Sequence, residues 1–278
     1  MNKWVINSAG ASKLEPGDRG LAYGDGLFET IAVRNSACRF LGEHLTRLLT
    51  GCQQLQIAPP DSAQLITSID ELIRNERCTN GVIKIIVTRG NGPRGYAFDA
   101  ATSAATVVIG VSTEEPHIPS AEGVSVRDCT TTVSRNNALA GIKTLNRLPQ
   151  VMARAEWQDD RFAEGLMSDD RGNLIGGTMS NLFIVRDNEI WTPPVNEAGI
   201  AGVMRGKILE SAETLNIRIT QRYFSKPDIN TACEVFLSNS LIGIWPVKQF
   251  ENQSFNVGPV TRQIMAALAK QGVTECLL

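Results

Sequence analysis

The sequence predicts a protein of the α/β class, with some α+β character, divided into two domains. Strand-like runs rich in β-branched residues alternate with amphipathic segments of helical spacing. A polar stretch with two prolines and no periodicity, residues 113–120, is typical of a linker. We therefore expect a small N-terminal α/β domain over residues 1–115 and a larger C-terminal domain over residues 116–278. With 42% hydrophobic content, 278 residues can form either one large core or two smaller ones.

The first half begins with a predicted strand at residues 27–33, which follows two glycine-containing turns. Hydrophobic residues then recur at helical spacing over residues 41–55 and again over residues 65–73, which predicts two amphipathic helices. Runs rich in β-branched residues predict two further strands, at 81–88 and 106–112. The glycine-rich segment 89–96 connects these two strands.

The second half is predicted to consist mainly of short strands. Strand-like composition at 124–133 precedes a helix that begins near residue 148, and turn signals at 168–173 and 186–189 each separate short apolar runs, as in hairpins. A helix at about 204–215, a strand from 217, another at 234–238 and a final helix around 264–268 complete the chain.

The composition excludes several functional classes. A formal net charge of −2 provides no basic field to attract nucleic acid or an anionic membrane. The first residues lack the apolar run of a signal peptide, and no segment approaches about 20 uninterrupted apolar residues, so we expect a cytoplasmic protein with a small-molecule substrate. The six cysteines form no C-x-x-C pair and there are two histidines, so no metal site is expected.

One lysine, Lys143, is the strongest candidate for chemistry. It lies among small and apolar neighbours just before the helix predicted from residue 148. Shielding from water disfavours the charged form of an amine, and a neutral amine can attack an aldehyde carbonyl to form a Schiff base. The alternative is a surface lysine whose charged end reaches solvent.

Four motifs support the catalytic interpretation of Lys143. They are the segments 18–30, 44–48, 139–148, and 180–183 together with 199–205. In these motifs and their order the chain resembles the fold-type IV pyridoxal phosphate enzymes, and the resemblance extends over nearly the whole chain. It implies pyridoxal 5′-phosphate as cofactor, attached to Lys143. It also implies a small N-terminal α/β sandwich, a larger domain with a barrel-like β-sheet, and a homodimer with shared active sites.

The resemblance also implies residues that bind the cofactor. Arg47 would bind phosphate oxygens with its guanidinium fork, although a solvated surface arginine is the alternative. The backbone amides of Val203 and Met204, at a helix N-terminus, would bind the same phosphate. Ile200 would lie against the pyridine ring. Further phosphate donors would come from Asn239 and Ser240, unless these two residues form an ordinary turn.

Candidates on the substrate side come from two segments. In the family, the loop equivalent to residues 94–96 can reach the partner subunit's site, where Arg94 and Tyr96 would recognise a substrate carboxylate. Phe28 and Thr30 would line the same cavity, with Thr30 as a catalytic residue beside the lysine. Alternatively, Phe28 and Thr30 are simply alternate residues of one strand. His44 has no evident partner in the sequence, and we expect a structural role.

Gly176 departs from the family pattern, which has a glutamate here that faces the pyridine nitrogen. An anion at this place keeps the ring nitrogen protonated and strengthens the ring as an electron sink. Three explanations remain open for the glycine. Another acid or water substitutes, the enzyme is impaired, or catalysis tolerates a neutral pyridine.

Within the family, residues 143–148 and 153–157 look most like those of the aminodeoxychorismate lyases. This resemblance implies conversion of 4-amino-4-deoxychorismate to 4-aminobenzoate and pyruvate, in the branch leading to folate. The alternatives are a D-amino-acid or branched-chain aminotransferase of the same fold, and a relative whose catalysis is impaired by Gly176.

Overall fold

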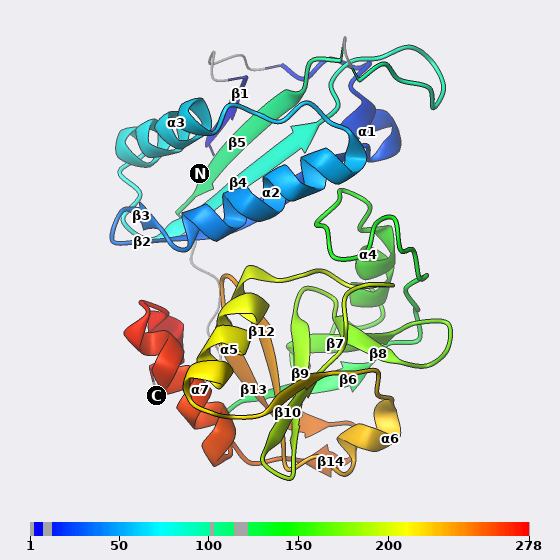
Figure 1. Cartoon of the computed structure of the whole chain (residues 1–278), viewed down its shortest axis with the longest axis vertical. Helices are drawn as coiled ribbons and strands as arrows, with labels where there is room; N and C mark the ends of the chain where they lie inside the picture. Colours follow the sequence, from blue (N-terminus) through cyan, green and yellow to red (C-terminus); the bar gives the residue numbers. More distant parts are fainter. Residues whose placement is uncertain (1–2, 8–12, 101–102, 114–121, 278) are drawn as a thin grey trace. The chain divides into compact units, whose positions relative to one another are not determined.

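The protein, described here from a computed structural model, separates into two compact units (Figure 1). The structure describes residues 3–7, 13–100, 103–113 and 122–277. The first unit comprises residues 1–116 together with 142–146, and the second comprises 117–141 and 147–278. The boundary expected between residues 115 and 116, and residues 114–120 of the expected linker, lie outside the described residues. The sequence placed residues 142–146 in the second domain, but the structure groups them with the first unit.

The first unit is built on a five-stranded antiparallel sheet in the order β1-β5-β4-β2-β3. The two strands predicted at 81–88 and 106–112 are observed with those bounds, and the predicted strand 27–33 extends by one residue at each end. The short edge strands β1 and β3 were not predicted. The strands are β1 (Lys3–Ile6), β2 (Gly26–Arg34), β3 (Ala37–Cys38), β4 (Gly81–Thr88) and β5 (Thr106–Ser112).

Helices α2 and α3 cover one face of this sheet (Figure 1). The helices are α1 (Arg19–Tyr23), α2 (Leu41–Leu55) and α3 (Ser62–Asn75), and the last two match the predicted amphipathic helices. In β2 the residues Leu27, Ile31 and Val33 are at most 2% exposed, whereas Phe28 and Thr30 are half-buried. Because side chains alternate between the faces of a strand, Phe28 and Thr30 share the face opposite that of the buried residues.

The segment around the lysine joins the first unit by pairing with β2. Leu27 and Thr144 form an antiparallel bridge, the Phe28 amide donates to the Lys143 carbonyl at 3.0 Å, and the Leu145 amide donates to the Gly26 carbonyl at 2.9 Å. These pairs form between residues more than a hundred positions apart in the sequence. Backbone pairing is the reason that residues 142–146 belong to the first unit.

The second unit contains a curled nine-stranded sheet, which agrees with the expected barrel-like sheet (Figure 1). Its order is β11-β10-β9-β12-β13-β6-β7-β8, with β14 paired to β13. Most neighbours are antiparallel, and the pairs β6–β7, β6–β13 and β10–β11 are parallel. The strands are β6 (Val124–Asp128), β7 (Glu164–Ser168), β8 (Leu174–Gly177), β9 (Asn181–Arg186), β10 (Glu189–Thr192), β11 (Ile219–Gln221), β12 (Glu234–Asn239), β13 (Gly243–Phe250) and β14 (Gln253–Ser254).

The helices of this unit largely follow the sequence prediction. They are α4 (Leu148–Arg154), α5 (Val203–Thr214), α6 (Lys226–Ile229), α7 (Pro259–Lys270) and the short 3₁₀ helix η1 (Thr274–Cys276). The first, second and fourth were predicted to within a few residues. Among the helices in the described ranges, none is long and apolar enough to cross a membrane.

Two predictions for the strands of the second unit were wrong in detail. The strand expected at 124–133 ends at Asp128, because the amides of Thr130 and Thr131 donate to the Glu156 carboxylate at 2.9 and 2.7 Å. Strand β13 was missed. Pro246 lies within it, and a proline is a signal against a strand interior because it has no N–H to donate.

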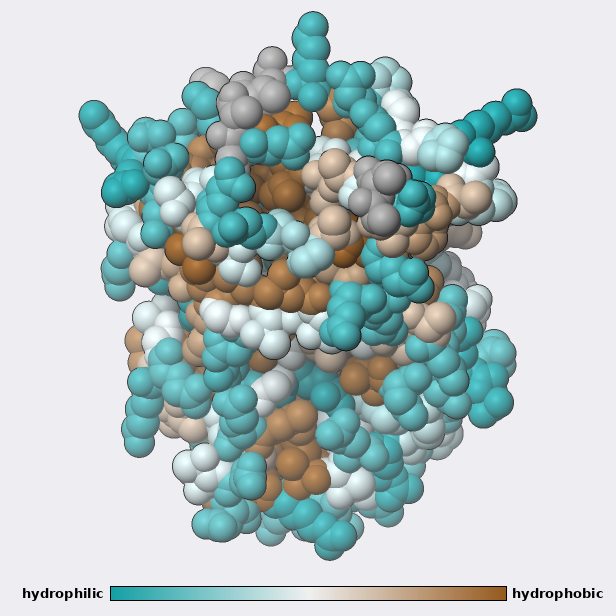
Figure 2. All heavy atoms as spheres, turned by 45° about the horizontal axis from the view of Figure 1, so that its top comes forward, coloured by the Kyte–Doolittle hydropathy of each residue, from teal (hydrophilic) through white to brown (hydrophobic). Residues whose placement is uncertain are grey.

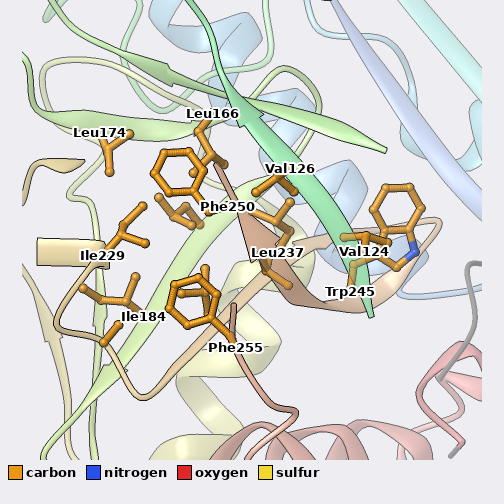
Figure 3. Close-up of a cluster of buried hydrophobic side chains, with 14 of the residues drawn as sticks. Val124, Val126, Leu166, Leu174, Ile184, Ile229, Leu237, Trp245, Phe250 and Phe255 are labelled. Atoms are coloured by element: carbon orange, nitrogen blue, oxygen red, sulfur yellow. The ribbon is translucent and has the colours of Figure 1, made fainter. Parts of the chain in front are cut away.

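Side chains from several strands form the core of the second unit (Figure 3). Val126, Leu166 and Leu237 are fully buried and come from β6, β7 and β12. They pack with aromatic residues that include Phe250 and Phe255. The curled sheet therefore encloses an apolar core.

Hydrophobic side chains also remain on the surface. On the face drawn in Figure 2, hydrophilic side chains project outward and hydrophobic atoms are gathered in patches. On helix α4, Leu148, Val151 and Met152 are 67%, 62% and 57% exposed. Their spacing of three and four residues places them on one face of the helix.

Replacement of Leu237 by alanine tests the core. We expect Leu237→Ala to lower the free energy of unfolding by about 2 to 5 kcal/mol, because a fully buried side chain leaves a cavity. Leu277→Ala, at a leucine that is 69% exposed, is the matched control, with an expected change within about 0.5 kcal/mol. Urea denaturation measures both. Equal effects of the two substitutions would contradict this description of the core.

Candidate functional site

Lys143 faces an aromatic ring on the strand with which it pairs. Its Nζ atom lies 4.2 Å from the centroid of the Phe28 ring, and Nζ of Lys84 lies 5.4 Å from the same centroid. Both contacts have cation–π geometry. Thr30 lies two residues further along β2, so its side chain is on the same face as Phe28. The structure thus brings three predicted site residues to one face of the first unit.

Glu29 lies between Phe28 and Thr30 and points to the opposite, helix-covered face, where it binds two residues of α2. Its carboxylate accepts from Nε of Arg47 at 2.8 Å and Nη2 of Arg47 at 2.5 Å, and from Nδ1 of His44 at 2.7 Å. Glu29 is 1% exposed. The bidentate pair fixes the direction of the Arg47 guanidinium.

Sequence reasoning missed the link between Glu29 and His44. The two residues are 15 positions apart and on different elements, so no local spacing indicates the contact. A signal was nevertheless present. Glu29 lies two residues from both Leu27 and Ile31, so its side chain lies on the same buried face of the strand. A buried carboxylate requires charged or polar partners.

The charges in this cluster favour an ionised glutamate and a neutral histidine. Burial raises the pKa of Glu29, but hydrogen bonds from His44 and Arg47 outweigh it and hold the pKa below its usual value. Burial lowers the pKa of His44, and the positive charges of Arg47 and Lys143 lower it further against the opposing effect of Glu29. A neutral His44 that donates from Nδ1 is consistent with both directions.

In the second unit, the start of helix α5 has the features of an anion site. The helix begins at Val203 after the N-cap Gly202, and amides in the first helical turn lack intrahelical acceptors. A Cβ atom at Gly202 would lie 2.1 Å from Oδ1 of Asn181. The side-chain Nδ2 of Asn181 in turn donates to the carbonyl of Ile200 at 2.9 Å. Asn181 therefore holds the segment that leads into the helix, and it requires a glycine there.

The segment before the lysine is anchored in the second unit. The Gly141 amide donates to the Gly199 carbonyl at 3.1 Å, and the Ala201 amide donates to the Gly141 carbonyl at 2.9 Å. Gly141 has a φ of +81°, a left-handed conformation that favours glycine. The chain then passes to the first unit between Gly141 and Ile142.

Gly176 lies on β8 in a backbone shaped for glycine. A Cβ atom at this position would lie 2.6 Å from the Ser180 carbonyl oxygen, which also accepts a hydrogen bond from the Gly177 amide at 2.8 Å. A side chain at 176 therefore requires the β8–β9 turn to move.

Glu164, on β7, is the carboxylate that shapes this turn. It is fully buried and accepts five hydrogen bonds, from the amides of Gly165, Thr178 and Met179 and from the hydroxyls of Thr178 and Ser180. Sequence reasoning missed its role, since its partners other than Gly165 are 14 to 16 residues away. Because these donors occupy both of its oxygens, Glu164 is committed to the turn.

The remaining predicted residues lie in turns and loops. Oδ1 of Asn239 accepts from the amides of Leu241 and Ile242, and its Nδ2 donates to the Met179 carbonyl at 3.2 Å. The turn that was the alternative for Asn239 is thus present. In the first unit, Arg94 and Tyr96 occupy an exposed loop, and Tyr96 is 83% exposed.

Comparison with known proteins identifies similar chains. The family model for amino-transferase class IV matches residues 26–250. An aminodeoxychorismate lyase of Vibrio harveyi is 32% identical over 271 residues, with 95% of this chain and 98% of that protein covered. A D-alanine aminotransferase of Bacillus licheniformis is 28% identical, with 93% and 91% covered. The crystal structure of 4-amino-4-deoxychorismate lyase from Pseudomonas aeruginosa is 41% identical, with a TM-score of 0.90 and coverage of 96% and 98%.

The cluster around Glu29 predicts how stability depends on pH. A histidine whose pKa is lowered on folding stabilises the native state above its unfolded pKa, near 6.5, and the stabilisation is lost as the pH falls from there. Glu29, whose pKa is also lowered, adds a loss at more acidic pH. We expect the urea midpoint to fall on acidification from pH 6.5, and His44→Gln to flatten the upper part of this decline. If the urea midpoint of the wild type and that of His44→Gln depended on pH in the same way, the buried neutral histidine would be contradicted.

Proposed function

The chain belongs to the class IV amino-transferase family, and on that basis we propose that it converts 4-amino-4-deoxychorismate to 4-aminobenzoate and pyruvate, in the branch leading to folate. It has the fold-type IV architecture, and its cofactor is pyridoxal 5′-phosphate. One observation carries the choice of reaction, namely 41% identity over 96% of the chain to a lyase of known structure. The 28% identity to a D-alanine aminotransferase keeps amino transfer as the second candidate.

The donors present in the chain suit a phosphorylated aldehyde. We assign covalent attachment to the Lys143 amine, phosphate binding to Arg47 and the amides of Val203 and Met204, and contact with the ring to Ile200. Glu29 already accepts from Nε and Nη2 of Arg47, so the fork expected from the sequence is engaged, and we propose that Arg47 contributes positive charge while the amides at the start of α5 supply hydrogen-bond donors. Asn239 and Ser240 remain candidates for additional phosphate contacts.

Lys143 is also the proton carrier in our proposal. Bound pyridoxal phosphate supplies the electron sink for negative charge at the substrate carbon that bears the amine. The neutral Nζ atom accepts the proton from that carbon and returns a proton to the departing group. Contact with the Phe28 ring restricts where Nζ can lie, and orientation of this kind lowers the barrier for proton transfer.

A homodimer is part of the proposal. The exposed apolar face of α4, formed by Leu148, Val151 and Met152, is the kind of surface that association buries. We assign Arg94 and Tyr96, on the exposed loop, to recognition of the substrate carboxylates, and we propose that they act in the partner subunit's site.

Product analysis of the purified holoenzyme tests the reaction. We expect release of 4-aminobenzoate and pyruvate from 4-amino-4-deoxychorismate, and no transfer of an amino group from D-alanine or a branched-chain amino acid to a keto acid. Amino transfer without 4-aminobenzoate would reject the lyase and support the second candidate.

Lys143→Ala tests the role of the lysine. Loss of the proton carrier should lower the rate of product release by about 10² to 10⁴-fold. In the wild type, borohydride reduction followed by peptide mass spectrometry should find the cofactor fixed to Lys143. Lys84→Ala is the control, because Lys84 contacts the same ring of Phe28 from a neighbouring strand. Fixation of the cofactor to another lysine would refute the assignment.

Gly176 provides a separate test. We propose that the enzyme is fully active with glycine at this position. Both Gly176→Ala and Gly176→Glu should lower the free energy of unfolding, since the Cβ atom would collide with the Ser180 carbonyl, and Gly176→Glu should not raise the lyase rate. Gly206→Ala, in α5, is the control, because a Cβ atom there meets nothing within 4 Å beyond the backbone of its own helix. A stable Gly176→Glu protein with a tenfold faster rate would show instead that the glycine impairs the enzyme.

A further inference from the structure

A buried arginine holds the backbone of the exposed loop that carries Arg94 and Tyr96. Arg19, on α1, is 4% exposed. Its Nη1 atom donates to the carbonyl of Gly95 at 2.9 Å and to that of Ala97 at 3.4 Å, and its Nη2 atom donates to the carbonyl of Tyr96 at 3.2 Å. One guanidinium group therefore contacts three consecutive carbonyls of the loop.

Additional contacts join helix α1 to the same loop. The Gly95 amide donates to the Tyr23 hydroxyl at 3.2 Å, and the rings of Tyr23 and Tyr96 lie 5.4 Å apart. A Cβ atom at Gly92 would lie only 2.8 Å from Cδ of Arg19, so the loop closes tightly around the arginine stem.

Asp25 fixes the arginine itself. Its carboxylate accepts from Nε of Arg19 at 3.0 Å and from Nε of Arg89 at 2.7 Å. Burial raises the pKa of Asp25, but the hydrogen bonds from Arg89 and Arg19 outweigh it and lower the pKa, so the carboxylate stays ionised at neutral pH. Nη2 of Arg89 also donates to Asp25, at 2.9 Å, and Nη2 and Nη1 donate to the carbonyls of Leu55 and Gln56 at the end of α2.

This arrangement has a consequence for the side chains of the loop. Arg19 binds the loop through backbone carbonyls, so the side chains of Arg94 and Tyr96 stay exposed. The backbone at Gly95 and Tyr96 is held by the arginine. A loop held in one conformation loses less entropy when it binds a ligand. An arginine fork is suited to this task because its donors are preorganised in a plane.

We propose that Arg19 is a positioning residue for substrate recognition, which fixes residues 95–97 so that Arg94 and Tyr96 meet a carboxylate-bearing substrate in one orientation. The inference rests on the proposed function for the role of Arg94. Its first part, that Arg19 orders the loop, is independent of any substrate.

Trypsin cleavage of the holoenzyme after Arg94 measures the order of the loop directly. We expect Arg19→Lys to accelerate cleavage of the Arg94–Gly95 bond about tenfold or more, because a lysine cannot reproduce the planar set of hydrogen bonds to the loop. Arg89→Lys is the matched control. Arg89 is equally buried and shares Asp25, but its carbonyl partners are at the C-terminal end of α2, and its contact with the 91–98 segment is the ring of Phe98. Mass spectrometry identifies the cleaved bond. An unchanged rate in Arg19→Lys, or equal acceleration in both variants, would overturn the proposal.

Steady-state kinetics tests the second part. Arg19→Lys should raise KM for 4-amino-4-deoxychorismate about tenfold with kcat within about twofold, and it should have little further effect in an Arg94→Met background. Faster cleavage with an unchanged KM would refute the role in recognition. Failure of the proposed reaction itself is recognised separately, since the wild type would then release no 4-aminobenzoate.

Discussion

The pairing of residues 143–145 with β2 is the constraint on which the rest of the candidate site depends. Antiparallel register places Lys143 opposite Phe28, on the face of the sheet opposite helices α2 and α3. A slip of one residue would reverse the face of every side chain in the segment and direct the lysine toward the helices. Backbone hydrogen bonds, rather than side-chain packing, therefore decide where the candidate nucleophile lies.

Strand β2 has different chemistry on its two faces. Phe28 and Thr30 face the lysine, while Glu29 between them binds His44 and Arg47 on α2. Consecutive side chains of β2 point to opposite faces of the sheet, so the strand has the lysine on one face and the buried charge cluster on the other. The positive charges of Arg47 and Lys143 both act on His44, so the two faces also interact electrostatically.

The sequence predicted features that depend on local pattern and missed those that depend on distant pairing. Strands β4 and β5 were predicted with their bounds because both are rich in β-branched residues, and α2 because its apolar residues recur at helical spacing. Strand β13 was missed because Pro246 interrupts it, and α1 because five residues carry no periodicity. Lys143 was selected as a candidate from its motif, but its place in the first unit depends on hydrogen bonds to residues 26–28. Likewise, Gly176 was recognised as unusual, whereas the Ser180 carbonyl that excludes a side chain there is visible only in three dimensions.

Asp25 also has an evolutionary consequence. It is a single negative charge between two arginines whose side chains are each 4% exposed, and these hold different parts of the first unit. Loss of Asp25 would leave two buried guanidinium groups without their shared counter-ion, and uncompensated buried charges are strongly destabilising. We therefore expect selection to act most strongly against substitution of Asp25, since loss of either arginine alone still leaves this carboxylate paired with the other.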